Sequence, residues 1–180
     1  HNDTRQAVEE ARRMSGLGAT WLLSATPWYN KPTPEGLTRH FTAIAEAASV
    51  PICLYNVPGR TAVNMKPDVV LRLCEHPNII GIKESSGDLA QVQHLLLGRP
   101  EGFAVLSGED WMTLAIIAAG GDGLISVAAN EIPRLMTRLV QHCRFGHFSE
   151  ARELLYLVLP LLEANFLETN PAPVKAALAA

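Results

Sequence analysis

The hydrophobic positions along the chain form two patterns, short apolar runs and longer amphipathic stretches. The apolar runs are rich in Leu, Ile and Val and predict buried strands at residues 19–25, 50–56, 79–83, 103–107 and 123–127. The amphipathic stretches predict helices over residues 3–15, 34–48, 67–74, 88–97, 110–119 and 131–145. From residue 148 onward the pattern is helical, and we expect Pro160, Pro171 and Pro173 to break it.

Short strands that each precede a helix are typical of βαβ units, and therefore of a parallel sheet. Two architectures compete, an open doubly wound sheet and a (β/α)8 barrel. An open nucleotide-binding sheet carries a glycine-rich turn after a strand, whereas the GGDG cluster at 120–123 precedes one. The barrel is therefore favoured, although five strands cannot close it. We predict an α/β fold, with a partial barrel over residues 1–145 and a helical C-terminal extension over residues 146–180.

Composition narrows the class of protein. Apolar residues make up 48% of the 180 residues and charged residues 18%, which is typical of a globular domain with a sizeable core. The net charge of −3, without a basic run, argues against nucleic-acid binding. No apolar run reaches the ~18 residues of a membrane span. The three cysteines have no CxxC spacing, which favours a reducing compartment, the cytoplasm, over a disulfide framework.

Polar side chains gather where the predicted strands end, and barrel enzymes carry their functional residues at those ends. Lys83 directly follows the apolar run NIIGI. A lysine in this place is more often a surface residue, or one half of an ion pair with its neighbour, here Glu84. The functional alternative is a Schiff-base lysine. A water-poor pocket disfavours an ammonium ion, and a neutral amine attacks a carbonyl carbon.

Two further residues could take part in such chemistry, and each also has a plainer explanation, while a third, Tyr29, is explained by packing. Tyr55 ends the strand before Lys83 and could carry protons, or it could be a half-buried aromatic residue. Arg60, in NVPGRT, could bind a substrate carboxylate, or it could be a solvated loop residue. Tyr29, in TPWYNKPTPEG, could serve packing alone. Motifs such as HExxH, GxSxG, SxxK, a Walker loop and paired Cys/His couplets are absent, so we expect no metal site.

Six segments together resemble the dihydrodipicolinate synthase (4-hydroxy-tetrahydrodipicolinate synthase) family, one of the pyruvate-dependent class I aldolases that include N-acetylneuraminate lyase. The segments are TPWYNKPTPEGL (26–37), LYNVPGRTAVNM (54–65), NIIGIKESSGD (78–88), VLSGED (105–110), GGDGLISVAAN (120–130) and ETNPAPVKAAL (168–178). They follow the family's order and spacing across essentially the whole chain. The resemblance implies a (β/α)8 barrel whose N-terminal third is missing here, and a homotetramer built as a dimer of dimers.

The resemblance also implies roles for individual residues. Lys83 matches the lysine that forms an imine with pyruvate, and Tyr55 matches the proton-relay tyrosine. Tyr29 matches a tyrosine that enters the active site of a neighbouring subunit. Arg60 matches the arginine that holds the carboxylate of the second substrate, aspartate semialdehyde.

Four more positions carry implied roles. Gly108 and Ile125 match backbone positions that line the pyruvate pocket. Asn2 and Trp28 match positions beside a lysine-feedback site, where the family commonly has tyrosine in place of this tryptophan. The family's Gly-Thr-Thr-Gly-Glu-type motif, which binds the pyruvate carboxylate and supplies a relay threonine, has no counterpart in this sequence.

The implied reaction condenses pyruvate with L-aspartate 4-semialdehyde to 4-hydroxy-tetrahydrodipicolinate. This carbon–oxygen lyase step belongs to diaminopimelate and lysine biosynthesis, and it uses a covalent imine on Lys83 without a separate cofactor. Two alternatives stay open. One is a lyase of the same family that acts on N-acetylneuraminate or a 2-keto-3-deoxy acid, although such lyases usually lack an arginine at the place of Arg60. The other is a catalytically incomplete fragment.

Overall fold

The computed structural model describes residues 1–180, which form two compact units, His1–Val105 and Leu106–Ala180. This division follows internal contacts. The predicted boundary after residue 145 separates barrel from helical extension instead, and it stays a prediction. None of the helices has the length and apolar character that crossing a membrane requires.

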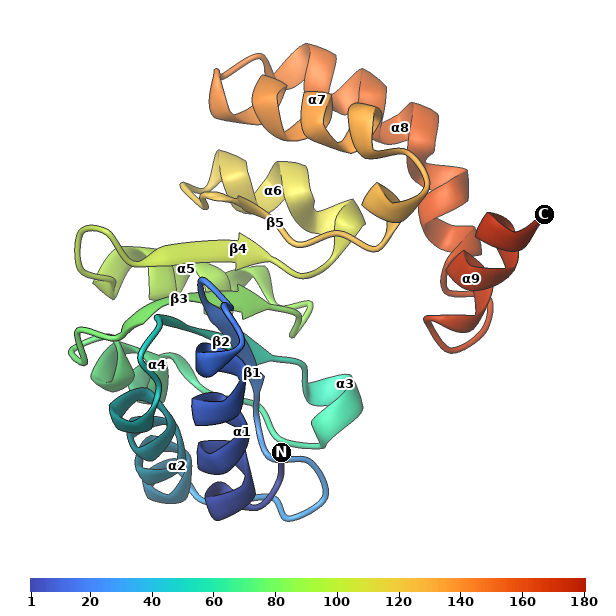
Figure 1. Cartoon of the computed structure of the whole chain (residues 1–180). Helices are drawn as coiled ribbons and strands as arrows, with labels where there is room; N and C mark the ends of the chain where they lie inside the picture. Colours follow the sequence, from blue (N-terminus) through green and yellow to red (C-terminus); the bar gives the residue numbers. More distant parts are fainter. The chain divides into compact units, whose positions relative to one another are not determined.

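The first unit alternates strands and helices, as the hydrophobic pattern predicts. Its elements are α1 (Thr4–Gly16), β1 (Leu22–Ala25), α2 (Pro34–Ala47), β2 (Ile52–Asn56), α3 (Pro58–Thr61), α4 (Pro67–Leu73), β3 (Ile79–Glu84) and α5 (Leu89–Gly98), followed by the start of β4 (Ala104–Ser107). Strand β2 pairs in parallel with β1 and with β3. Helix α1 packs against α2, α2 against α4, and α4 against α5, so these helices form a row beside the strands (Figure 1).

The strand register divides the side chains of this sheet between two faces, because successive side chains of a strand point to opposite sides. One face carries two aligned rows, Leu23–Cys53–Gly81 and Ala25–Tyr55–Lys83. The alternate positions Ile52, Leu54 and Ile82 are fully buried on the other face. Their burial stabilises the unit, while the first face presents the polar side chains at the strand ends.

The second unit is mainly helical. Its elements are η1 (Asp110–Met112), α6 (Thr113–Ala118), β5 (Gly123–Leu124), η2 (Ala128–Asn130), α7 (Pro133–Arg144), α8 (Phe148–Ala164) and α9 (Ala172–Ala179). Residues from α6, η2, α7 and α8 form its hydrophobic core, which includes Met136, Leu139 and Leu162. Strands β4 and β5 pair in parallel, and the strand order β1-β2-β3-β4-β5 is the order expected of consecutive βα units.

Two expectations for the second unit were wrong in detail. The strand predicted over 123–127 ends at Leu124, because the backbone N–H groups of Val127 and Ala128 donate to the Asp110 carboxylate and turn the chain into η2. Pro160 does not break the last long helix, since α8 continues through it. Its side chain lies on the exposed face of α8, and the buried opposite face, with Val158 and Leu162, holds the helix together.

Candidate functional site

Lys83 and Tyr55 lie side by side at the C-terminal ends of neighbouring strands. They are aligned in the β2–β3 register, so their side chains point to the same face of the sheet. The Lys83 amine lies 4.4 Å from the centre of the Tyr55 ring, within the range of a cation–π interaction. Both residues are half-buried. The fold thus brings together two residues that the sequence placed on separate strands, and their catalytic roles stay predictions.

A layer of small side chains lies next to this pair on the same face. Cys53 and Gly81 are aligned with each other two residues before Tyr55 and Lys83. A Cβ atom at Gly81 would lie 2.7 Å from the carbonyl oxygen of Ala104, so a larger residue could not fit without moving this backbone. Burial raises the pKa of the Cys53 thiol to about 11. The thiol is therefore neutral at physiological pH and is a poor nucleophile.

Arg60 lies on a short helix, α3, that the hydrophobic pattern did not predict. The helix ends at Thr61, and the next residue, Ala62, adopts a left-handed conformation with φ of 59°. The Thr26 hydroxyl donates to the Thr61 hydroxyl at 2.9 Å, and the backbone N–H of Thr26 donates to the Tyr55 carbonyl at 3.1 Å. These bonds fix the exposed Arg60 loop to the ends of β1 and β2.

Tyr29 points into solvent and is 86% exposed. Its backbone φ is 71°, an unusual conformation for a tyrosine. The next residue anchors this loop, because Asn30 donates to the Asn2 carbonyl at 3.1 Å and accepts from the Asn2 amide at 3.4 Å. The Trp28 ring lies 5.7 Å from the His1 ring, centre to centre. Asn2 and Trp28, both predicted for an effector site, therefore belong to one local surface.

The two remaining predicted positions lie in the second unit. Gly108 follows β4 directly, and Ile125 follows β5. The backbone N–H of Ile125 donates to the Ser107 carbonyl at 2.9 Å and so extends the β4–β5 ladder. Both positions are half-buried and directly follow parallel strands, and their role in lining a pyruvate pocket stays a prediction.

Sequence reasoning missed a buried polar network in the first unit. Asn56 donates to both carboxylate oxygens of Glu84 at 3.1 Å, and Gln91 donates to one of them at 3.2 Å. Asn64 joins through hydrogen bonds with Asn56 and Gln91. A signal was available, since Asn56 and Glu84 each directly follow a predicted site residue, and two polar residues at the ends of buried strands need partners.

The network also argues against the simplest explanation for Lys83, which is an ion pair with Glu84. Adjacent residues on a strand point to opposite faces, and Glu84 forms no salt bridge. Its hydrogen-bond donors are neutral, and the nearest is the backbone N–H of Ser86 at 2.7 Å. Burial raises the pKa of Glu84, while hydrogen bonds from Asn56, Ser86 and Gln91 oppose that rise. Lys83 is therefore not held by its neighbour in the sequence.

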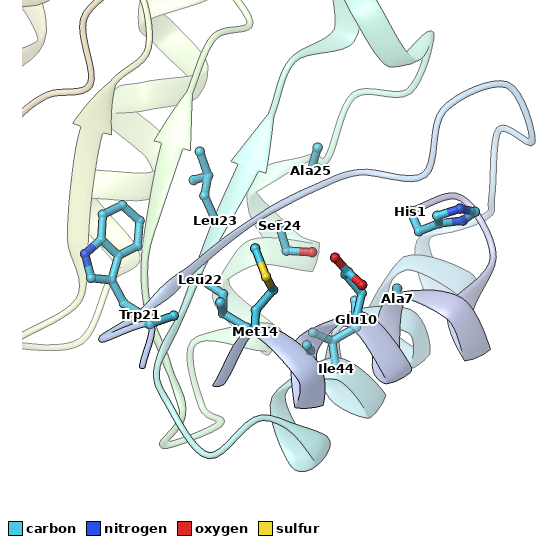
Figure 2. A pocket seen from close by; sticks show the side chains of 12 residues that line it. His1, Ala7, Glu10, Met14, Trp21, Leu22, Leu23, Ser24, Ala25 and Ile44 are labelled. Carbon is cyan, nitrogen blue, oxygen red and sulfur yellow. The ribbon is translucent and has the colours of Figure 1, made fainter. Parts of the chain in front are cut away.

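An open pocket of about 500 Å³ lies between α1, β1 and one residue of α2 (Figure 2). Met14, Leu22 and Ile44 contribute apolar surface to it, and Glu10 and Ser24 contribute oxygen atoms. None of the residues predicted for catalysis lines this pocket. No group of three or more His, Cys, Asp and Glu side chains is arranged to hold a metal ion.

Comparison with known proteins gives a consistent result. The model of the Dihydrodipicolinate synthetase family matches residues 1–180. A curated relative from Acidobacterium capsulatum, a 4-hydroxy-tetrahydrodipicolinate synthase, is 53% identical over 181 residues, which cover 99% of this chain and 60% of the relative.

Solved structures of similar proteins have the same fold. A dihydrodipicolinate synthase from Acinetobacter baumannii, complexed with pyruvate, is 42% identical with a TM-score of 0.96, and the match covers 99% of this chain and 61% of that one. The enzyme from Cyanidioschyzon merolae, with lysine bound, is 39% identical with a TM-score of 0.96 at coverages of 99% and 61%.

The chain spans about 60% of the length of the curated relatives it matches. Within that length the agreement in fold confirms the predicted fold class, a five-stranded parallel part of a (β/α)8 barrel with additional helices. The family model matches from the first residue to the last, and the relatives share about half of their residues with the chain over the matched region. The chain belongs to the Dihydrodipicolinate synthetase family.

Proposed function

We propose that this chain carries the Schiff-base half of a pyruvate-dependent condensation, with Lys83 as the nucleophile. The observation that supports the proposal best is the Lys83–Tyr55 pair, an amine 4.4 Å from a phenol ring at the ends of adjacent strands. An amine of this kind attacks a ketone, and a neighbouring phenol can move the protons that attack and dehydration require. Family membership indicates which ketone, since a relative has been solved in complex with pyruvate.

The proposed steps begin at the Lys83 amine. It attacks the keto carbon of pyruvate, the carbinolamine loses water, and an imine forms between Nζ and that carbon. The protonated imine withdraws electrons from the methyl group, which loses a proton to give an enamine. The enamine carbon then attacks the aldehyde carbon of L-aspartate 4-semialdehyde. Finally the amino group of the adduct attacks the imine carbon, closes the ring and displaces Lys83, which gives 4-hydroxy-tetrahydrodipicolinate.

Tyr55 and Tyr29 are proposed to carry protons in these steps, and Arg60 to bind the carboxylate of the aldehyde substrate. The guanidinium group of an arginine forms two parallel hydrogen bonds with a carboxylate. The connection of α3 to the ends of β1 and β2 supports this role, because it holds Arg60 beside the strand that carries Tyr55. Gly108 and Ile125 are proposed to present backbone groups to pyruvate.

The proposal extends to the assembly and its setting. We expect a homotetramer in which the exposed Tyr29 enters the site of a neighbouring subunit, in the cytoplasm, with no cofactor other than the imine. Asn2 and Trp28 are proposed to contact a lysine effector. Two contacts support this role, the hydrogen bond from Asn30 to the Asn2 carbonyl and the ring contact of Trp28 with His1, since they bring Asn2 and Trp28 to one surface. The relative solved with lysine bound supports it as well. A lysine titration of wild-type protein and of Asn2→Ala tests it by a change in half-inhibiting concentration.

Borohydride trapping with pyruvate tests the central proposal. The 180-residue chain and the same chain joined to the N-terminal region of the Acidobacterium capsulatum relative are incubated with pyruvate, reduced and digested. Peptide mass spectrometry should find the reduced pyruvyl adduct on Lys83 and not on Lys66, an exposed lysine of the same unit that serves as the internal control. Lys83→Arg should abolish the adduct. Folded protein without an adduct in either form would contradict the proposal.

The second substrate is tested separately on the form that traps pyruvate. Aspartate semialdehyde added before the borohydride should consume the imine and so lower the yield of reduced adduct, whereas N-acetylmannosamine, the aldehyde partner of N-acetylneuraminate lyase, should not. Consumption by the sugar alone would favour the sugar-acid lyase in place of the synthase, while leaving the Schiff base in place.

A further inference from the structure

The Glu84 carboxylate lies directly behind the Lys83–Tyr55 pair and is 2% exposed. It accepts hydrogen bonds from Asn56, from Gln91 and from the backbone N–H of Ser86, at distances of 2.7 to 3.2 Å. All of these partners are neutral donors. A buried carboxylate held in this way is costly to desolvate, so a role beyond packing is expected of it.

The hydrogen bonds of this network join four segments of the first unit. Asn56 ends β2, Glu84 ends β3, and Gln91 lies in the first turn of α5. The loop before α4 contributes Asn64, and the backbone N–H of Met65 donates to Asn56 Oδ1 at 2.9 Å. The C-terminal ends of β2 and β3, two neighbouring strands in Figure 1, are therefore connected by side chains as well as by the backbone ladder.

The position of the network relates it to the reactive pair. In the β2–β3 register Asn56 is aligned with Glu84, one residue beyond the alignment of Tyr55 with Lys83. The two alignments point to opposite faces of the sheet. A shift of Glu84 against Asn56 would therefore also displace Lys83 against Tyr55.

We propose that Glu84 is a positioning residue, which, through Asn56 and Gln91, holds the ends of β2 and β3 so that Lys83 and Tyr55 stand side by side for imine formation. This inference rests on the proposed function. Every group that faces the carboxylate is a donor, so the site needs a residue that accepts hydrogen bonds on both of its terminal atoms. A glutamine has nearly the same shape, but its terminal NH₂ group is a donor. Placed at the oxygen that accepts from Asn56 and Gln91, it would face two donors and could accept from neither.

The test compares Glu84→Gln with Glu46→Gln, which removes a carboxylate from an exposed position on α2. Rates of borohydride trapping are measured against pyruvate concentration in the form that traps pyruvate. We expect Glu84→Gln to lower the saturating rate about ten- to hundredfold, since a misplacement of about 1 Å can have that effect. The half-saturating pyruvate concentration should change little, and Glu46→Gln should behave like wild type.

A second variant of the network separates positioning from general damage. Gln91→Ala keeps the Glu84 carboxylate and its bonds from Asn56 and Ser86, and of that carboxylate's hydrogen bonds removes only the one from Gln91. This variant should lower the saturating rate severalfold, by less than Glu84→Gln does. If it traps pyruvate at the wild-type rate while folded by circular dichroism, positioning through the network is overturned. If Glu84→Gln does not fold, the Gln91→Ala rate decides on its own.

Labelling of lysine amines by acetic anhydride gives a readout that does not depend on pyruvate. On the 180-residue chain we expect Glu84→Gln to increase the labelling rate of Lys83 severalfold, because the amine leaves the Tyr55 ring, while Lys66 and Lys175 label as before. Absence of a pyruvyl adduct in the wild-type protein would overturn the proposed function. The labelling rate of Lys83 would still show whether Glu84 positions it. Equal Lys83 labelling in wild type and Glu84→Gln would overturn the inference even where the adduct forms.

Discussion

At the scale of single residues, Arg60 offers the cleanest separation of the two substrates. If it binds the carboxylate of the aldehyde substrate, Arg60→Ala should leave pyruvyl trapping on Lys83 unchanged. The concentration of aspartate semialdehyde that half-consumes the imine should rise about ten- to hundredfold, which corresponds to about 1.4–3 kcal/mol of lost binding. Arg60→Lys keeps the charge but loses the paired hydrogen bonds. Its half-consuming concentration should therefore lie between those of wild type and Arg60→Ala. An unchanged half-consuming concentration in Arg60→Ala would assign the carboxylate to another residue.

The residues that follow strands were predictable, and the residues that hold them were not. Lys83 and Tyr55 stand out because each polar side chain ends an apolar run. The network behind them depends on Asn64 and Gln91, which are 27 residues apart along the chain. Amide side chains are common in loops and helices, so nothing local marks these two as partners. Only the fold shows that Glu84 bonds to amides, where the sequence suggested a lysine.

At the scale of elements, the packing of α1 on α2 includes a buried histidine, which makes it sensitive to acid. His40 is 3% exposed, shares a hydrogen bond with the Thr4 hydroxyl at 2.8 Å and has no partner at Nε2. Burial, with a smaller contribution from the N-terminal amine, lowers the pKa of His40 from 6.5 to about 4, while Asp3 opposes the shift. The folded chain therefore keeps His40 neutral at a pH where the unfolded chain protonates it.

The sign of the effect follows from this difference. The contribution of His40 to stability is complete above pH 6.5 and is lost as the pH falls towards 4. Between pH 7 and pH 4.5 we expect the free energy of unfolding to fall by about 2 to 3 kcal/mol from this residue. The measurement is urea unfolding at both pH values, with His40→Gln as the variant that cannot titrate. An equal fall in wild type and His40→Gln would assign the acid sensitivity to other groups.

Most elements were predicted within a few residues of their ends, because amphipathic periodicity marks helices and apolar runs mark strands. The differences arise from side chains that bond to the backbone across the fold. Asp110 ends β5 early. Asn78 donates to the carbonyl oxygens of Ala45, Ala48 and Val50, and so fixes the chain between α2 and β2. Contacts of this kind join residues that are far apart in the sequence, which local patterns do not encode.

At the scale of the whole molecule, the parallel α/β class and the order of the strands followed from the alternation of strands and helices. Barrel membership came from the motifs, since five strands alone fit other architectures. The division into two compact units at residue 105 was not predicted. It falls within β4, inside a continuous apolar run, where composition and periodicity give no sign of a boundary.

The outer edge of β1 leads to the last prediction. β1 is at the end of the strand order, and Trp21 and Leu23 on and beside it are 45% and 41% exposed. The pocket of about 500 Å³ between α1 and β1 opens at the same place (Figure 2). An exposed strand edge with apolar side chains favours pairing with another segment. The relatives have additional length, and a region of them is the natural candidate, since the chain covers 60% of the one from Acidobacterium capsulatum.

Joining the N-terminal region of that relative to this chain should therefore bury Trp21 and raise the midpoint of thermal unfolding. The rise should be about 2–4 °C for each added ~1 kcal/mol of stability, as is typical of domains of 150–250 residues. Tryptophan fluorescence should shift to shorter wavelength as the indole leaves water. In the joined chain with Trp21→Phe, the stabilisation should persist and the spectral shift should largely disappear, because Trp28 and Trp111 lie outside the β1 edge. A joined chain that melts and fluoresces like the 180-residue chain would show that this edge does not accept the region.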